Sequence, residues 1–418
     1  MFEIFGKKIV SNTAWLLSAN LFTKVIGLGY NIFLARSLGP TNYGLFIFGL
    51  TLFGLVSSVA DFGISRFLTR DLSKNPRKAA ELISKTFSLS LFLSSVISLI
   101  LILALVIFDR NVARVIVGSV MIATVFPNTL AQIIAATFTA LEKMRYAAFS
   151  LIFLNLSVTA LGVIALLVLN LHVGGVAVSF LISHFLFLLL FYVFLIKEKI
   201  KLVFIFNSKI WIRILQSSIP YGLLTVLGLV YFRIDSVLLT YLRGETETGF
   251  YGASYRFLDA VQFIPIAVSQ ALFPTFTRLH ESSISDLKKI YFKSLALLSI
   301  LGLVVTAFVF LLAPVIINLV YGVSYQPSII ALKILSFAIF FQFIHIPGAH
   351  LLFATEKFLK PVIYLSILAV GFNIAANLIF IPVYGFVAAS FVTLISEILS
   401  FIFIFWFIWT KVFKTANE

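Results

Sequence analysis

The sequence predicts an all-α integral membrane protein in which twelve transmembrane helices form two parallel-repeat six-helix bundles around a central cavity. Composition, uncharged stretches and an internal repeat predict this class. Hydrophobic residues make up 61% of the 418 residues and charged residues only 11%, whereas soluble domains are about half apolar and about one quarter charged. Tyr146–Ile196 contains no Asp, Glu, Lys or Arg. Because a bilayer core takes about 20 apolar residues as a helix, soluble and disordered classes are excluded.

Charged or turn-like segments divide the apolar stretches into the predicted helices. In the first half the helices span residues 10–35, 42–67, 84–108, 114–140, 146–169 and 174–196. In the second half they span residues 213–241, 248–275, 290–313, 328–353, 361–381 and 386–410. The two bundles are therefore residues 1–196 and 213–418. Residues 197–212 alternate bases with apolar residues, which is typical of an amphipathic linker on the cytoplasmic membrane surface.

The distribution of the basic residues predicts the orientation of the chain. The net charge is +15, and most of the 31 Lys and Arg residues lie in segments on the same side as the N-terminus. Because cytoplasmic loops are enriched in Lys and Arg, we expect a multi-pass protein of the cell membrane with both termini in the cytoplasm. A ring of short basic loops is also a poor nucleic acid site, which would need one basic patch.

The sequence lacks the residue patterns that metal binding and enzyme catalysis usually require. There is no cysteine, and the five histidines have no metal-site spacing. Neither metal nor cofactor is expected, except a coupling proton or sodium ion. His345 and His350 are expected to pack or to line a cavity. The predicted outward loops are short, for example Pro382–Gly385, and offer no room for the catalytic carboxylates of a membrane glycosyltransferase. We therefore expect a protein that is not an enzyme.

Three short sequence matches link the two halves. They pair Ala35–Gly44 with Thr240–Gly249, Leu141–Lys143 with Thr355–Lys357, and Gly174–Phe180 with Gly385–Phe391. The matches occur in the same order at a nearly constant offset, which indicates a duplicated six-helix unit. Because six is even, both copies cross the membrane in the same direction. In membrane transporters built from such repeats, the substrate site lies between the two halves, near the middle of the bilayer.

Motifs at the ends of helices 1, 2 and 7 and at the start of helix 8 are informative. Their residues are, in chain order, Arg36, Gly39, Pro40, Tyr43 and Gly44, then Asp61, Gly63 and Arg66, then Arg233, Asp235, Gly249 and Tyr251. With these motifs, the chain resembles the polysaccharide-biosynthesis branch of the multidrug/oligosaccharidyl-lipid/polysaccharide exporter superfamily over almost its whole length. Peptidoglycan-precursor flippases generally have fourteen helices, so a count of twelve points away from them.

The resemblance implies a flippase that works by alternating access. Its substrate would be an oligosaccharide linked to a polyprenyl phosphate or diphosphate, moved from the inner to the outer leaflet. Expected partners are therefore this substrate, membrane lipid, and a glycan polymerase or glycosyltransferases, with no nucleic acid. A multidrug or cation exporter of the same superfamily is the first alternative, although its cavity should be acidic and aromatic. A glycan polymerase or ligase and a scaffold without transport are the others.

Ionisable residues inside membrane helices are costly and normally face a cavity or the bundle interior. The expected substrate-binding residues are Asn20, Lys24 and Asn31 in the first helix, Arg233 and Asp235 in the seventh, and Arg256 and Asp259 in the eighth. The bases would offset the phosphate charge, and the amides would replace water around sugar hydroxyls. The structural alternative is that Arg256 pairs with Asp259, Arg233 pairs with a nearby acid, and Lys24 bonds Asn20 or reaches the membrane surface.

Two buried carboxylates, Asp61 and Glu397, are candidate sites for a coupling proton or sodium ion. Asp61 lies near the cytoplasmic end of its helix, where pairing with Arg66 is the alternative. Glu397 lies well inside the last helix with no base within one turn. Burial would favour its protonated form, and a hydrogen bond to Ser400 or Thr393 is the alternative.

Overall fold

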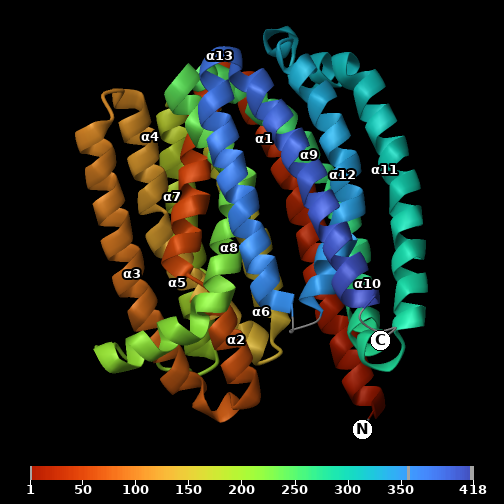
Figure 1. The fold of residues 1–418 in the computed structure, drawn as a ribbon. Coiled ribbons are helices and arrows are strands. Elements are labelled where there is room, and N and C mark those ends of the chain that lie inside the picture. The colour runs from red at the N-terminus through yellow and green to blue at the C-terminus, as the bar shows by residue number, and fades with distance from the viewer. Residues whose placement is uncertain (1, 355–357, 415–418) are drawn as a thin grey trace. The chain divides into compact units, whose positions relative to one another are not determined.

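The computed structural model describes residues 2–354 and 358–414, and all the regular secondary structure in that part of the chain is helical (Figure 1). The main helices are α1 (Phe2–Asp61), α2 (Ile64–Lys74), α3 (Ala79–Phe108), α4 (Val112–Ala123), α5 (Val125–Ala140), α6 (Met144–Leu167), α7 (His172–Lys197), α8 (Ser208–Arg243), α9 (Glu245–Val261), α10 (Phe263–Ser282), α11 (Ile284–Val320), α12 (Ser328–Phe353) and α13 (Leu359–Phe407). Short 3₁₀ helices η1 (Pro76–Lys78) and η2 (Val323–Tyr325) and a π-helical end η4 (Ile408–Phe413) complete the list.

The helices confirm the predicted fold class. Within the described residues, ten segments are long and apolar enough to cross a membrane. Two of them hold two helices each, because α1 bends at Gly39 (φ 70°) and α13 bends at Gly385 (φ 59°). Figure 1 shows the two legs of α13 side by side. Counting each leg separately reproduces the predicted twelve helices. The repeat match at Thr355–Lys357 lies outside the described residues.

Several helices present apolar surface to their surroundings, as expected of a protein that lies in lipid. On α3 and its end, Ile107 is 70% exposed and Phe108 is 83% exposed. On α11, Leu311 and Leu319 are 71% and 72% exposed. A water-soluble protein would rarely leave such a continuous apolar surface uncovered.

The chain packs into two compact units. The first comprises the residues up to Leu38 together with Leu45–Arg233, and the second comprises Gly39–Gly44 together with the residues from Ile234 on. The units differ from the predicted bundles at the turn 39–44 and over residues 213–233, because α1 and α8 each contribute to both units. The bundle boundaries inferred from the sequence repeat stay a prediction.

In the first unit, the short helix α2 is amphipathic. Its apolar residues recur three and four positions apart, which places them on one face. Ile64, Phe67, Leu68 and Leu72 are buried there. They join a core that includes Phe138 of α5 and Phe191 of α7, whose rings lie 6.1 Å apart. The opposite face of α2 carries exposed bases, Arg66 and Arg70 among them.

Some predicted helix boundaries differ from the structure. The helix predicted over residues 42–67 breaks at Phe62 and Gly63, which both have positive φ. A Cβ at Gly63 would lie 2.6 Å from the Gly222 backbone nitrogen, so only glycine allows this turn to pack against α8. The helices predicted over 114–140 and 248–275 are also interrupted, at Thr124 and Gln262.

Candidate functional site

Glu397, on the second leg of α13, lies in a buried polar cluster of the second unit. Its side chain is 0% exposed, and carboxylates are seldom buried so fully without partners. Gln342 Nε2 donates a hydrogen bond to Glu397 Oε1 at 3.1 Å, and His345 Nδ1 lies 3.1 Å from Glu397 Oε2. Both partners come from α12, where a spacing of three residues places them on one face. The carboxylate is therefore held against an imidazole by tertiary packing.

Two asparagines on the first leg of α13 extend this cluster. Asn377 Nδ2 donates to Asn373 Oδ1 at 3.0 Å, and Asn373 Nδ2 donates to Ser396 Oγ at 3.4 Å. Asn373 is 2% exposed and Asn377 is 0% exposed. Asn377 Oδ1 and Gln342 Oε1 accept no hydrogen bond from the residues that the structure describes. Buried acceptors without a donor are costly, and they could accept a hydrogen bond from a protonated group or coordinate a cation.

Asp235, in α8, is linked to the same leg of α13 by a chain of hydroxyl groups. Tyr251, in α9, donates a hydrogen bond from its hydroxyl to Asp235 Oδ2, and this hydroxyl lies 2.9 Å from Thr393 Oγ1. Ser236 N donates to Asp235 Oδ1 at 2.7 Å. Asp235 is only 1% exposed. Thr393 precedes Glu397 by one helical turn, so hydrogen-bonded polar groups of α8, α9, α12 and α13 occupy neighbouring turns of one unit.

Arg256 and Asp259, both on α9, form the ion pair that the sequence offered as the structural alternative. Arg256 Nη1 lies 3.7 Å from Asp259 Oδ2, and both side chains are partly buried. Arg256 also interacts electrostatically with Tyr43 and Tyr321. The guanidinium therefore pairs with an acid of its own helix in the second unit. A role for this pair in substrate binding stays a prediction.

The other predicted substrate residues belong to the first unit. Asn20 and Lys24 are exposed on α1, while Asn31 and Arg233 are partly buried. Asn31 Nδ2 donates to the Gly27 carbonyl oxygen at 2.7 Å, and its buried Oδ1 accepts no hydrogen bond from any described residue. Their convergence with Arg256 on one substrate also stays a prediction.

Asp61 has a local structural role at the start of α2. Its Oδ1 accepts hydrogen bonds from Ser65 N at 3.1 Å and from Ser65 Oγ at 2.5 Å. Such bonds satisfy backbone donors in the first turn of a helix. Arg66 acts on Asp61 electrostatically, whereas Ser65 forms the hydrogen bonds. The hydrogen-bond partner of Asp61 is therefore Ser65, whereas the structural alternative proposed from the sequence was a pair with Arg66. Ion coupling at Asp61 stays a prediction.

The sequence reasoning missed most of the cluster around Glu397. Gln342 and His345 are three residues apart, and Asn373 and Asn377 are four apart, on otherwise apolar helices. Each spacing marks a polar stripe on one helix face. These stripes were a usable signal, but nothing in the sequence showed that the first would meet Glu397 and the second Ser396, its neighbour in the chain.

Two glycine-containing turns contact each other inside the second unit. Thr41 Oγ1 lies 2.8 Å from Thr246 Oγ1. A Cβ at Gly44 would overlap the Glu245 carbonyl oxygen, and a Cβ at Gly249 would overlap the Pro40 carbonyl oxygen. The two halves of the sequence repeat therefore meet through equivalent residues, with glycine at each point of close backbone approach.

The buried charged and amide side chains lie in a polytopic helical membrane protein, and solved structures share its fold. An inward-facing multidrug resistance MATE family transporter of the MOP superfamily aligns with a TM-score of 0.71 and 18% identity, over 95% of this chain and 96% of that one. The lipid II flippase MurJ, in an inward closed conformation, aligns with a TM-score of 0.73 and 16% identity, over 94% of this chain and 86% of that one. The chain has the fold of MOP superfamily transporters.

The family follows from the sequence comparison. The family of polysaccharide biosynthesis proteins matches residues 9–280, and the chain belongs to this family. An uncharacterized membrane protein of Methanocaldococcus jannaschii is 22% identical over 436 aligned positions, which cover 97% of this chain and 84% of that protein. The predicted family is thus confirmed.

Proposed function

We propose that this protein is a flippase that moves a lipid-linked oligosaccharide from the inner to the outer leaflet by alternating access. Membership of the polysaccharide biosynthesis protein family carries the proposal. The substrate would be an oligosaccharide on a polyprenyl phosphate or diphosphate. No bond of the substrate needs to form or break, so the protein acts as a transporter and not as an enzyme.

The same proposal assigns the location and the partners. The basic loops favour the cytoplasmic membrane, with both termini in the cytoplasm. Glycosyltransferases on the inner face would supply the lipid-linked oligosaccharide, and a glycan polymerase on the outer face would receive it. Contact with either class of enzyme would shorten the transfer of a poorly soluble substrate.

In this proposal, three bases within the spans bind the phosphate of the substrate. Lys24, Arg233 and Arg256 supply positive charge, because a phosphate cannot enter hydrocarbon without compensation. Asn20 and Asn31 bind sugar hydroxyls, and the buried Oδ1 of Asn31 supports this because it accepts no hydrogen bond from a described residue. Asp235 and Asp259 position the neighbouring basic and phenolic groups.

The proposed coupling site is Glu397 with its partner His345. Glu397 Oε2 lies 3.1 Å from His345 Nδ1 and accepts no hydrogen bond from a described residue, while the Gln342 amide donates to Oε1. Ion uptake there would change the charge of a carboxylate that is fully buried between α12 and α13. Sodium is the alternative ion, and Asp61 is the second candidate carboxylate.

The experiment uses the purified full chain in proteoliposomes with a fluorescent lipid-linked oligosaccharide in the inner leaflet. We expect the labelled glycan to become accessible to a membrane-impermeant quencher only when the protein is present. Efflux of a cationic dye is the parallel assay, because a multidrug exporter of this fold is the second candidate. Dye efflux without movement of the glycan would contradict the flippase and support the exporter.

A further inference from the structure

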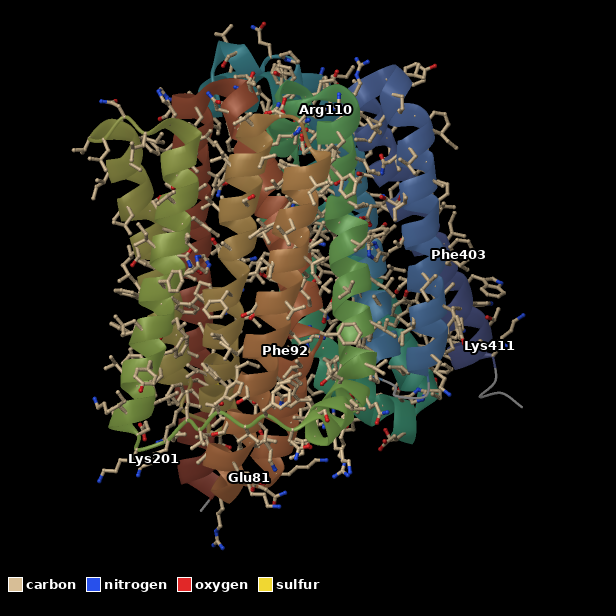
Figure 2. The ribbon with its side chains drawn as sticks, turned by 90° about the vertical axis from the view of Figure 1, so that its left-hand side faces the viewer. Glu81, Phe92, Arg110, Lys201, Phe403 and Lys411 are labelled. Atoms are coloured by element: carbon tan, nitrogen blue, oxygen red, sulfur yellow. The ribbon has the colours of Figure 1, made fainter. Side chains whose placement is uncertain are left out.

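The segment between α7 and α8 forms a surface strap, which we define as residues 199–213. Most of it is extended, and Figure 2 shows it near Lys201, crossing the end of α3 between the levels of Phe92 and Glu81. α8 begins within it, at Ser208. The predicted linker, residues 197–212, therefore comprises the last residue of α7, a non-helical segment and the first residues of α8.

Hydrogen bonds from the strap to α3 hold it in register. Val203 N donates to Ser84 Oγ at 3.0 Å, and Ile205 N donates to Ser88 Oγ at 2.9 Å. Four helical residues rise by about 6 Å, and two extended residues span about 6.6 Å, so the two serines match alternate residues of the strap. Trp211 is buried and packs against Phe92, with ring centroids 5.3 Å apart. The strap is thus a defined part of the fold.

The strap exposes apolar side chains that α3 does not cover. Val203 is 61% exposed, Phe204 is 59% exposed, Phe206 is 70% exposed and Ile212 is 55% exposed. These residues surround the point where the extended chain turns into α8. Exposed aromatic and aliphatic side chains at the end of a membrane span typically enter the boundary between headgroups and acyl chains.

The same strap carries four exposed bases, Lys199, Lys201, Lys209 and Arg213. Among the residues that the structure describes, none provides these four side chains with an ion pair or a hydrogen bond. The sequence from Lys199 to Arg233 contains no Asp or Glu. The positive charge of the strap is therefore not neutralised within its own segment.

The position of the strap indicates which kind of partner neutralises its positive charge. α7 ends at Lys197 and α8 begins at Ser208, and both helices are long and apolar enough to cross a membrane. Their shared end must therefore lie near the bilayer surface. We infer that the strap is a binding site for the phosphate headgroups of anionic bilayer lipids, with its exposed apolar residues inserted beside them. This inference does not rest on the proposed flippase activity.

Charge and apolarity together favour a lipid over a soluble polyanion. A nucleic acid or an acidic protein would satisfy the four bases, but it would leave Phe204 and Phe206 against water. An anionic lipid offers phosphate for the bases and acyl chains for the rings. Arg213 lies one residue beyond Ile212, so the two chemistries alternate along the strap as they do at a membrane surface.

The test measures binding of a short-chain phosphatidylglycerol to the full-length protein in a neutral detergent, with short-chain phosphatidylcholine as the comparison lipid. We expect the wild type to prefer phosphatidylglycerol. Replacing all four bases with Gln (K199Q/K201Q/K209Q/R213Q) should weaken that binding by at least about tenfold, because each base near an anionic surface raises affinity several-fold. The F204S/F206S variant should weaken it less while keeping its salt dependence.

Two control variants make the result decisive. A charge-retaining variant (K199R/K201R/K209R/R213K) should bind like the wild type. A variant with four neutralised bases in the second unit (R278Q/K288Q/K289Q/K293Q) loses the same charge and should keep most of the affinity. If this control loses as much affinity as the strap variant, net charge explains binding and the inference is overturned. Equally tight binding of heparin by the wild type and by F204S/F206S would overturn it in favour of a soluble polyanion.

Discussion

Thr41 and Thr246 are 205 residues apart in the sequence, yet their hydroxyl oxygens lie 2.8 Å apart. The same step relates Gly39 to Gly244, and both glycines have positive φ. A duplicated unit thus places two equivalent turns in direct contact. The contact depends on Gly44 and Gly249, which are also 205 residues apart and which lie where the two backbones approach most closely.

We predict that Gly44→Ala and Gly249→Ala each destabilise the protein. The added Cβ would overlap a backbone carbonyl oxygen of the opposite turn, and overpacking of this kind costs about 1–3 kcal/mol. Thermal unfolding of the detergent-solubilised protein measures the effect. The matched control is Gly371→Ala, because a Cβ at that helical glycine meets nothing within 4 Å. An unchanged unfolding temperature in both turn variants would contradict the reported close approach.

We predict that Glu397→Gln removes the response of transport to a pH gradient and leaves folding intact. Gln has nearly the same shape and can keep the hydrogen bond to Gln342, but it cannot exchange a proton with His345. In proteoliposomes, a gradient of about one pH unit should change wild-type transport by up to about tenfold, because one coupled proton then supplies about 1.4 kcal/mol, and the variant should not respond. Glu81→Gln, at an exposed position, is the control. Wild-type flux that ignores both proton and sodium gradients would remove the coupling proposal.

We predict that Lys24→Gln and Arg256→Gln each reduce movement of the lipid-linked oligosaccharide by more than about tenfold, because hydrogen bonds to charged groups contribute about 2 kcal/mol. Expression and membrane insertion should persist. Flux in proteoliposomes and the amount of purified protein are the two measurements. Lys289→Gln, which removes an exposed base paired with Asp286, is the control. If both variants transport normally, the bases do not bind the substrate.

We predict that Glu198 makes stability depend on pH in the acidic range. The hydrogen bond from Lys143, and then that from Tyr146, lower the pKa of Glu198 from its ordinary value of 4.5. A folded-state pKa below the unfolded one stabilises the fold at pH values above 4.5, and this contribution is lost as pH falls through the folded pKa. Glu198→Gln should therefore lower the unfolding temperature near neutral pH, by an amount that corresponds to no more than about 1 kcal/mol.

The pH profile also separates this ion pair from other effects. The difference between the wild type and Glu198→Gln should shrink as the pH falls below 4.5. Glu281→Gln, at an exposed position, should show a smaller difference at neutral pH. A difference for Glu198→Gln that grows towards acidic pH would contradict the assigned sign.

The sequence predicted the helical elements well because their signal is local. Long uncharged stretches identify spans, and Gly39 and Gly385 mark the two sharp bends. The end of the second helix was harder to predict. The turn at Phe62 and Gly63 depends on the approach of Gly222 from α8, which no local pattern contains.

By itself, the sequence determined that the chain crosses the membrane repeatedly, that it carries a repeat, and which family it resembles. Only the tertiary structure decided the partners of the buried polar residues. Helical spacing shows that Gln342 and His345 share a face of α12, but not that this face meets Glu397. A periodic pattern specifies directions around one helix axis, whereas a contact between helices also depends on their rotation and their relative height. These two quantities are set by packing across the whole unit.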